Sequence, residues 1–549
     1  MISAADLLIV PIVLPLAAGA GMLFLSGDRH RNLKAAINVA VVTTLVCVAI
    51  ALLSMSNAHP AGINEVYRLG DWPAPFGIVL ALDRLSALML LLTSILALAA
   101  VVFSLARWHR AGAHFHSLFQ FLLMGLNGAF LTGDLFNLFV FFELLLAASY
   151  GLALHGSGLA RVKAGLHYII MNLAASLLFL IGVSLIYGVA GTLNMADLAE
   201  RIPTIAAENR GLLEAGAGIL GIAFLLKAGM WPLCFWLPTT YAAVSPPVAS
   251  IFAIMTKVGA YVVLRLSLLL FGAGAGASAG FGSNWLLFGG LATIVFGAIG
   301  SLASQDMARL AAFSVLVSSG TLLAATGMGQ VGVTAGALFY LVSSTLGIGA
   351  FFLLVELIER GREPGADMLA VTREAYEADE DVNEEAEVGK AIPATLGLLG
   401  VAFIGCTLVI VGLPPLSGFI AKFALLTAAL HPLETPQALE APQAGAISAN
   451  SWALLVVLMI SGFATLIAMT RAGIRTLWAS SDRAVPPVRV VEIAPVMFLL
   501  ILCVVQTAQA GPVMRFMQAT AQSLHTPADY IRSVLPETGG QSAHKAGST

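Results

Sequence analysis

Charged side chains are scarce in this chain. Only 10% of its 549 residues are Asp, Glu, Lys or Arg, whereas soluble domains carry about 25%. Hydrophobic residues make up 59% of the chain, and the formal net charge is −3. The few charges argue against a soluble globular protein, and their negative balance argues against a nucleic-acid partner. The composition therefore predicts a polytopic membrane protein.

Cysteine pairs and nucleotide-binding motifs are also missing. The chain has no CxxC pair, and its four cysteines lie far apart in or beside apolar segments: Cys47, Cys234, Cys406 and Cys503. This spacing indicates inert thiols, so we expect no metal or iron–sulfur site. No GxGxxG follows a predicted strand and no P-loop occurs, so we expect no organic cofactor. The N-terminus lacks a basic region before its apolar run, which predicts a first span rather than a cleaved signal.

Apolar runs of bilayer length recur along the chain. A helix that crosses about 30 Å of hydrocarbon needs about 20 apolar residues. The runs predict an all-α polytopic membrane protein with about 14 transmembrane helices. They lie near 6–25, 33–55, 79–106, 115–132, 135–155, 164–189, 212–231, 246–270, 284–303, 308–329, 332–358, 393–411, 452–475 and 488–509.

Basic loops predict the orientation of these spans. They follow spans 1, 3, 5, 9 and 13, and they contain Arg29, Arg31, Lys34, Arg107, Arg110, Arg161, Lys163, Arg309, Arg471, Arg475 and Arg483. Because short loops rich in Lys and Arg stay in the cytoplasm, this face is predicted to be cytoplasmic and both termini to lie outside. The acidic insert 359–390 holds eleven acids against four basic residues. It is expected to be a solvated cytoplasmic loop, with partner docking as the alternative.

Two predicted spans contain helix-breaking residues. The first break carries Pro232 and Pro238, and the second carries Gly412, Pro414 and Pro415. Proline removes a backbone donor and clashes with the preceding turn, and lipid tolerates the freed carbonyls only inside protein or beside water. Paired interrupted segments indicate a transport path. Two unrelated proline kinks are the alternative.

Ionisable residues lie deep in several predicted spans. Glu143 is at the middle of an apolar segment that offers nothing to neutralise it, and charge at that depth costs at least about 2.5–3.5 kcal/mol. Lys227 lies beside the first break. Burial disfavours a charged lysine and a nearby carboxylate favours it, so this pair could load and release a proton. Lys257 and Lys422 continue the series. The alternatives are a structural ion pair for Glu143 and an interfacial, snorkelling Lys422.

Other polar residues in the spans give weaker signals. His167 lies near Lys163 in span 6 and could relay protons or be a satisfied core histidine. Glu356 is expected to be solvated near a cytoplasmic helix end. Arg265 could anchor the end of a span, and Asp83 is expected to belong to a helix start.

Several segments together resemble a known family. FFELLLAASYGL, KAGMWPLCFWLPTTYAAVSPP, TKVGAYVVLR, SQDMARLAAFSVLVSSG and GLPPLSGFIAKF are similar to the antiporter-like subunits of respiratory complex I and of multisubunit Mrp-type cation/proton antiporters. VYRLGDWPAPFGIVLALDRLSALMLLLT and PLCFWLPTTYAAVSPP most resemble the D subunits of the Mrp (Mnh/Pha) antiporters. The similarity extends over roughly residues 5–510.

This resemblance implies two inverted five-helix repeats, spans 4–8 and 9–13, with broken helices at spans 7 and 12. The implied division is 1–111 for the first three spans, 112–270 and 283–476 for the repeats, and 477–549 for the last span and tail. By motif match, the proton-translocating residues are Glu143, Lys227, Lys257 and Lys422. The resemblance also implies a charged axis at mid-membrane that half-channels connect to both surfaces.

One segment departs from the family pattern. Many relatives carry a histidine or lysine in span 11, where this chain has Ser343, Ser344 and Thr345. The step from Lys257 to Lys422 must then use water, these hydroxyls or another residue. Alternatively, only the half of the axis that contains Glu143 is active.

A second departure separates the two branches of the family. The histidines common around the span-7 break of complex I subunits are absent, and Cys234 and Tyr241 stand there. This difference favours the Mrp D type.

Three functions are consistent with the sequence. The first is a proton-translocating subunit of a Na⁺ or K⁺/H⁺ antiporter, a secondary transporter of six or seven different subunits in a bacterial inner membrane. The second is a proton-pumping subunit of an NADH dehydrogenase or membrane hydrogenase, and the third is a scaffold with a vestigial axis. Because Glu143 is the only mid-span carboxylate and no cage of carboxylates is visible, we expect this chain to carry mainly the proton.

Overall fold

The structure is a computed structural model that describes residues 5–25, 30–58, 63–112, 114–360, 394–431, 447–478 and 488–535. Most of the acidic insert 359–390 and the end of the C-terminal tail lie outside these described residues.

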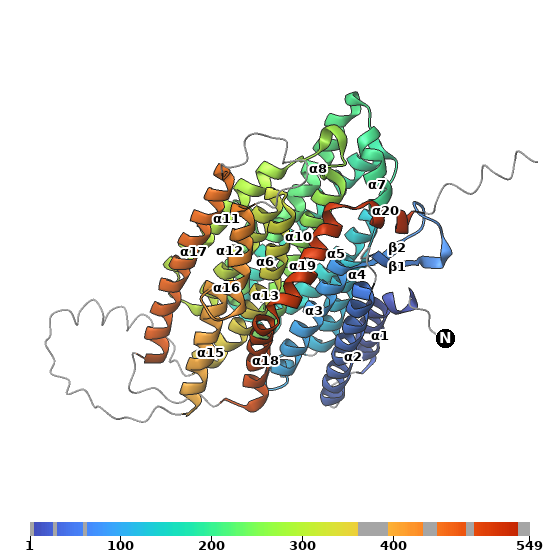
Figure 1. Cartoon of the computed structure of the whole chain (residues 1–549). Helices are drawn as coiled ribbons and strands as arrows, with labels where there is room; N and C mark the ends of the chain where they lie inside the picture. The colour runs from blue at the N-terminus through green and yellow to red at the C-terminus, as the bar shows by residue number, and fades with distance from the viewer. Residues whose placement is uncertain are drawn as a thin grey trace, which may run out of the picture.

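Long helices run side by side through one bundle (Figure 1). They are α1 (Val10–Phe24), α2 (Arg31–Ala58), α3 (Arg84–Ser104), α4 (Phe115–Leu131), α5 (Leu135–Ala153), α6 (Leu159–Ala190), α8 (Ala207–Ala228), α10 (Pro246–Phe271), α11 (Ser283–Ala303), α12 (Met307–Met328), α13 (Val331–Glu359), α15 (Ala394–Val411), α17 (Ala449–Gly473) and α18 (Val490–Ala508). In the described residues, twelve helices are long and apolar enough to cross a membrane, and α1, α4 and α16 (Ser417–Leu430) are shorter apolar helices. This set is compatible with the predicted fourteen spans and establishes a multi-pass membrane protein.

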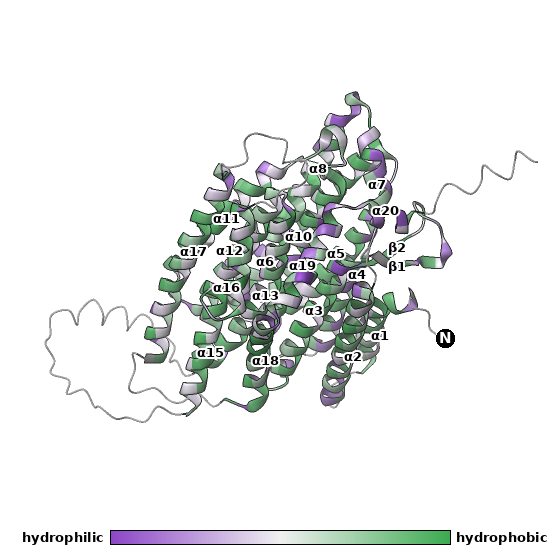
Figure 2. Cartoon of the chain, viewed as in Figure 1, coloured by the Kyte–Doolittle hydropathy of each residue, from purple (hydrophilic) through white to green (hydrophobic). Residues whose placement is uncertain are grey.

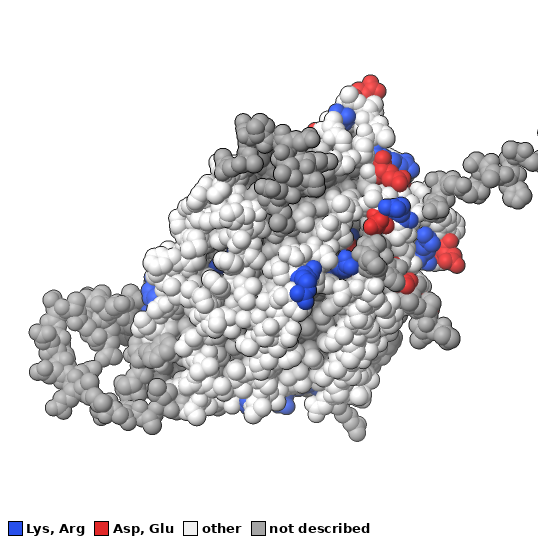
Figure 3. Space-filling view, viewed as in Figure 1, with Lys and Arg blue, Asp and Glu red and all other residues white. Residues whose placement is uncertain are grey.

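The centre of the bundle is formed by α10, α12 and α13. Almost all side chains of their apolar windows are buried, whereas more than half of those of α2, α6 and α17 are not buried. The exposed side chains on the outer helices are themselves large and apolar, among them Leu177, Phe288 and Phe463. Figure 2 shows hydrophobic colour along most of the bundle helices. On the face that Figure 3 shows, most charges gather near α7 (Met195–Arg201), α20 (Ala528–Val534) and the hairpin described next. An apolar exterior of this kind is suited to lipid.

A β-hairpin precedes α3, and the sequence did not reveal it. Strands β1 (Ile63–Arg68) and β2 (Val79–Asp83) pair antiparallel. The predicted start of span 3 at residue 79 was therefore wrong, because its first five residues form the buried strand β2. The helix begins at Arg84, where the Asp83 carboxylate caps it by accepting from the Ser86 amide at 2.7 Å. A short continuous apolar run such as Val79–Leu82 fits a buried strand as readily as a helix start.

Two C-terminal helices fold back on the bundle. α19 (Ala510–His525) packs against α13 and α10, and α20 packs against α7 and β1. In Figure 1, α19 crosses the front of the bundle and α20 lies beside the hairpin. His525 binds the hydroxyl of Thr334 at 3.0 Å, which fixes the end of α19 to the start of α13. The tail is thus part of the packed structure up to residue 535.

A buried ion pair joins these outer elements to the core. Arg265 of α10 contacts the Asp83 carboxylate at 2.6 Å, and both side chains are almost fully buried. The Arg265 guanidinium also lies over the rings of Tyr261 and Tyr530, the latter from α20. The prediction that Arg265 anchors a span end is corrected, because its partner is a carboxylate rather than the lipid interface.

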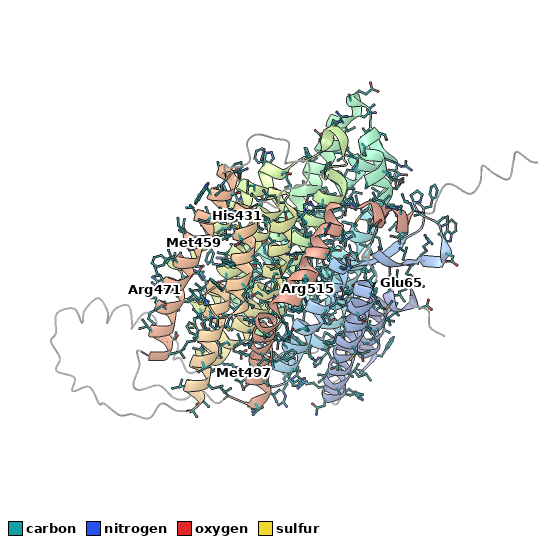
Figure 4. All side chains as sticks on the ribbon, in the orientation of Figure 1. Glu65, His431, Met459, Arg471, Met497 and Arg515 are labelled. Carbon is teal, nitrogen blue, oxygen red and sulfur yellow. The ribbon has the colours of Figure 1, made fainter. Side chains whose placement is uncertain are left out.

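We expect Arg265→Met to destabilise the protein by about 3–5 kcal/mol, because Asp83 would be left as an uncompensated buried charge. The melting temperature of the purified complex measures this loss. Arg265→Met combined with Asp83→Asn should recover part of it, since Asn still caps α3. The exposed Arg515, labelled in Figure 4, provides the control Arg515→Met, which should leave the melting temperature unchanged. Equal melting of Arg265→Met and wild type would contradict this role of the pair.

Candidate functional site

The deep carboxylate and the first deep lysine lie on neighbouring parts of α5 and α8. Glu143 is half-buried and accepts a hydrogen bond from the Ser176 hydroxyl of α6. The Lys227 ammonium lies 4.9 Å from the ring centroid of Phe142, the residue before Glu143. In the described part of the chain, Lys227 Nζ is buried without a hydrogen-bond partner. The two charges are therefore near each other without forming a direct ion pair.

Helix α8 is interrupted directly after Lys227. It ends at Ala228, Gly229 adopts the left-handed conformation with φ +73°, and the helix resumes as α9 (Trp236–Ala243). Pro232 lies in the gap and Pro238 in the first turn of α9, where a helix needs no donor from that residue.

Other helices satisfy the backbone groups at this break. The Ala228 carbonyl accepts from the Ser319 hydroxyl of α12, and the Trp231 amide donates to the Thr293 hydroxyl of α11 at 2.9 Å. An interrupted helix is tolerated at membrane depth only with such replacements.

The second break holds the last lysine of the series. Helix α15 ends at Val411, and α16 begins at Ser417, so Pro414 and Pro415 lie between them. The Lys422 ammonium donates to the freed Val411 carbonyl at 2.6 Å. A cation at the C-terminal end of a helix is also favoured by the helix dipole. Lys422 is therefore bound to the broken end of the preceding helix.

A line of hydroxyl groups extends from the central lysine. Lys257 is fully buried in α10, and its ammonium donates to the Ser318 hydroxyl of α12 at 2.6 Å. Ser318 in turn donates to Ser344 of α13 at 2.8 Å. The neighbouring Ser343 bonds the Ser417 hydroxyl at 2.8 Å, at the start of α16. The two central serines of α13 thus contact α12 on one side and α16 on the other.

Close helix packing brings the first two lysines to one region. A Cβ on Gly259 of α10 would lie 2.7 Å from the Ala228 amide nitrogen, so only glycine permits this approach of α10 to the end of α8. Lys257 and Lys227 are near this crossing in sequence. In addition, Ser318 and Ser319 bind Lys257 and the Ala228 carbonyl respectively, so one turn of α12 contacts both sites.

Two predicted relay residues lie apart from this line. His167 is exposed on the surface of α6, and the structure does not bring it to the buried lysines. The Thr345 hydroxyl donates to the Leu341 carbonyl of its own helix at 2.6 Å. The structure therefore brings Ser343 and Ser344, but not His167 or Thr345, into contact with the other members.

A cavity of about 430 Å³ opens near the helix ends that carry the basic loops. It is lined by Arg107, Trp108, Tyr241, Glu356, Glu359 and Arg360, among others. At its inner end, Tyr241 and Thr256 share a hydroxyl–hydroxyl bond of 2.5 Å. Thr256 directly precedes Lys257 in α10. The cavity therefore extends toward the turn of α10 that carries the central lysine, with a pair of buried hydroxyls between Tyr241 and that turn.

The prediction that Glu356 is solvated was wrong. Its carboxylate accepts from the Trp108 indole at 2.5 Å and from Arg360 at 2.8 Å, and Arg360 also binds Glu492 of α18 at 2.7 Å. Burial by itself lowers the pKa of Arg360, but the hydrogen bonds to Glu492 and Glu356 outweigh this effect and raise the pKa above its ordinary value. Arg360 thus stays charged at the edge of the cavity.

Sequence reasoning missed several members of the site. Ser318 stands in SVLVSSG, where two hydroxyls at mid-span were the available signal. Ser417 begins α16 just after the two prolines and looked like an ordinary helix start. Glu492 lies near the start of the last span and gave no signal of its contact with Arg360.

The fold and the site together indicate the class of membrane protein to which this chain belongs. Deep lysines beside two interrupted helices, within a multi-pass bundle, are typical of membrane subunits that conduct ions. Residues 132–434 match the family model described as NADH:quinone oxidoreductase/Mrp antiporter, TM. The chain belongs to this family.

Individual relatives cover nearly the whole chain. A protein from Rhizobium meliloti (strain 1021), named as the probable D subunit of a K⁺/H⁺ antiporter, is 60% identical over 97% of this chain and 99% of that protein. The Na⁺/H⁺ antiporter D subunit of Alkalihalophilus pseudofirmus is 30% identical over 97% of this chain and 100% of that protein. These matches confirm the resemblance to the D subunits of cation/proton antiporters.

Solved structures show the same fold. A chain in the structure of the Mrp complex from Dietzia sp. DQ12-45-1b is 25% identical, with a TM-score of 0.78 over 97% of this chain and 99% of that chain. A chain of the archaeal membrane-bound sulfane sulfur reductase is 20% identical, with a TM-score of 0.80 over 96% of this chain and 99% of that chain. The second likeness concerns the fold alone.

We expect Gly412→Ala to destabilise the second break. Gly412 has φ +82°, and an added Cβ would lie 2.7 Å from Lys422 Cδ. The left-handed conformation alone costs a non-glycine residue about 1–2 kcal/mol. The matched control is Gly400→Ala inside α15, where an added Cβ meets nothing within 4 Å and helix propensity favours alanine. Melting of the purified complex should fall for the first variant only; a similar result for both would contradict the argument.

Proposed function

We propose that this chain is the proton-translocating subunit of a monovalent cation/H⁺ antiporter. The subunit would be part of a secondary transporter built from six or seven different subunits in a bacterial inner membrane. One observation carries the proposal most directly: hydroxyl groups beside the two broken helices extend from the buried Lys257 of α10 to Ser417, at the start of the helix that carries the half-buried Lys422. Such groups can pass protons through an interior that excludes larger ions.

The hydroxyl line provides a proton-transfer step between Lys257 and Lys422, for which the sequence offered no histidine or lysine in span 11. Each serine hydroxyl both donates and accepts, so a proton can enter on one side while another leaves. Lys257 is the donor at one end, and Lys422 lies beyond Ser417 at the other. The shift from Ser344 to Ser343 along α13 requires reorientation of these hydroxyls or an intervening water.

The cavity beside Glu356 is the proposed access from the basic face. From it, a proton would pass Tyr241 and Thr256 to reach Lys257. The proposal places this face in the cytoplasm and both termini outside, and it treats spans 4–8 and 9–13 as the two repeats.

The coupled cation is proposed to be K⁺ in preference to Na⁺, because the relative at 60% identity is named for K⁺ and that at 30% for Na⁺. In vesicles that hold the whole complex, K⁺ should collapse an imposed ΔpH at lower concentration than Na⁺. A lower half-effective concentration for Na⁺ would contradict this preference while leaving proton translocation by the chain intact.

We propose that the pair Glu143 and Lys227 loads and releases the proton that the Lys257 series carries. Glu143→Gln and Lys227→Ala should therefore each abolish cation-driven ΔpH in these vesicles, because each removes one titratable group of this pair. Loss of a proton-transfer group typically costs about 10²–10⁴-fold in rate. Assembly is checked by co-purification of the other subunits. If both variants assemble and still transport, the buried series is structural and the scaffold hypothesis replaces the proposal.

Ser318→Ala tests the hydroxyl line itself. It removes the acceptor of Lys257 and should slow antiport by at least about tenfold. Ser314→Ala is its control, since Ser314 is buried one turn earlier in α12 but bonds only the Leu310 carbonyl of its own helix. Equal rates for the two variants would show that protons do not need Ser318.

A redox complex is the alternative assembly for a subunit of this family. Its prediction differs in one respect, because flavin or iron–sulfur partners would co-purify with the chain. The likeness to the sulfane sulfur reductase extends to the fold only, so the antiporter proposal is preferred.

A further inference from the structure

The proposed proton path needs an exit at the end of the bundle opposite the basic loops. α10 begins at Pro246, which lines the cavity near those loops, so its later residues approach the opposite end. Tyr261 lies one turn beyond Lys257, and Arg265 lies one turn beyond Tyr261. All three side chains are buried. α10 therefore carries polar groups from the centre of the bundle toward the end where an exit is needed.

Hydrogen bonds join Tyr261 to the ion pair of Arg265 with Asp83. The Tyr261 and Ser86 hydroxyls are 3.3 Å apart, and Ser86 also accepts from Arg265 Nη2 at 3.0 Å. The same nitrogen binds the Asp83 carboxylate at 2.6 Å. The hydroxyls and the carboxylate are thus connected through one guanidinium group. Ionisable groups buried in a transmembrane bundle often mark proton paths.

Two small cavities border this connected group. The first has a volume of about 10 Å³, and Tyr261 and Leu341 are among its lining residues. The second has a volume of about 20 Å³ and is lined in part by Asp83, Arg265 and Tyr530. A water needs about 10–15 Å³ of such space. The second cavity therefore has room for one water, and the first is at the lower limit.

The second cavity is bordered by side chains with unsatisfied polar atoms. Tyr530 belongs to α20 and is 5% exposed, and Arg265 is 6% exposed. The guanidinium lies over the Tyr530 ring and acts on its hydroxyl electrostatically. Even so, neither the Tyr530 hydroxyl nor Arg265 Nε forms a hydrogen bond within the described residues. Buried polar atoms are seldom left in this state, and an ordered water commonly binds them.

We propose that a water held by Tyr530 and Arg265 in the second cavity is the proton-release site of this subunit, which rests on the proposed function and adds the exit to its path. An excess proton that reaches the Ser86 and Tyr261 hydroxyls passes through a further water beside the ion pair to the held water. The held water then transfers one proton to bulk water. Arg265 and Asp83 keep their charges, so one proton enters and one leaves. The negative Asp83 carboxylate favours an excess proton on a neighbouring water.

Tyr530 is a positioning residue in this proposal, and Tyr530→Phe tests it. The variant removes an oxygen without a hydrogen bond in the described residues and keeps the ring beside Arg265. In vesicles that hold the whole complex, it should slow cation-driven ΔpH by at least about tenfold and leave the melting temperature unchanged. The control is Tyr187→Phe, at a tyrosine of α6 that is 54% exposed, which should change neither quantity. Equal antiport by Tyr530→Phe and wild type would overturn the proposal.

Hydroxyl-radical footprinting of the wild-type complex detects the water without measuring transport. X-ray pulses generate radicals from water in place, so a buried side chain is oxidised where it contacts an ordered water. Tyr530 should be oxidised, whereas Tyr168, which is fully buried and whose hydroxyl binds Ser149 at 2.7 Å, should not. A Tyr530 that stays as unmodified as Tyr168 would contradict the proposed water.

The Ser318→Ala variant separates this inference from the function on which it rests. If Ser318→Ala slows antiport and Tyr530→Phe does not, the chain still translocates protons and the release site is overturned. If neither variant slows antiport, the hydroxyl line and the release site are both overturned. Slower antiport in both variants, with Tyr530 oxidised in the wild type, is the expected result.

Discussion

The structure depends on one constraint: a backbone group freed inside an apolar bundle needs a new partner. α8 and α15 each end within the bundle, and the last carbonyl of each is bound by a side chain. At Ala228 the donor is Ser319, and at Val411 it is Lys422. The same side chains, or their direct neighbours, belong to the proposed proton path. Interrupted helices thus place polar groups in an interior that would otherwise have few of them.

Ion pairs and single charges occupy different parts of the molecule. Arg265 with Asp83, and Arg360 with Glu356 and Glu492, are direct pairs near the two opposite ends of the core helices. By contrast, the lysines at mid-depth contact a hydroxyl, a carbonyl or an aromatic ring. A direct carboxylate partner would stabilise the ammonium form strongly, whereas neutral partners leave deprotonation accessible. The pairs at the ends hold the bundle together, and the lysines between them are free to exchange protons in the proposed mechanism.

Sequence patterns alone were enough to predict the membrane class, most of the spans, both helix breaks and the deep Glu143, Lys227, Lys257 and Lys422. These features depend on local properties: hydropathy over about 20 residues and the restricted backbone of proline and glycine. The partners of these residues became visible only in the folded bundle. Ser318 meets Lys257 across 61 positions, and Arg265 meets Asp83 across 182. The ion pair of Glu356 with Arg360 is local, four residues along α13. Glu356 looked solvated because Trp108, which donates to it from 248 positions away, and Glu492, which binds Arg360, come from distant parts of the chain. Contacts of this kind arise from helix packing, which no local pattern records.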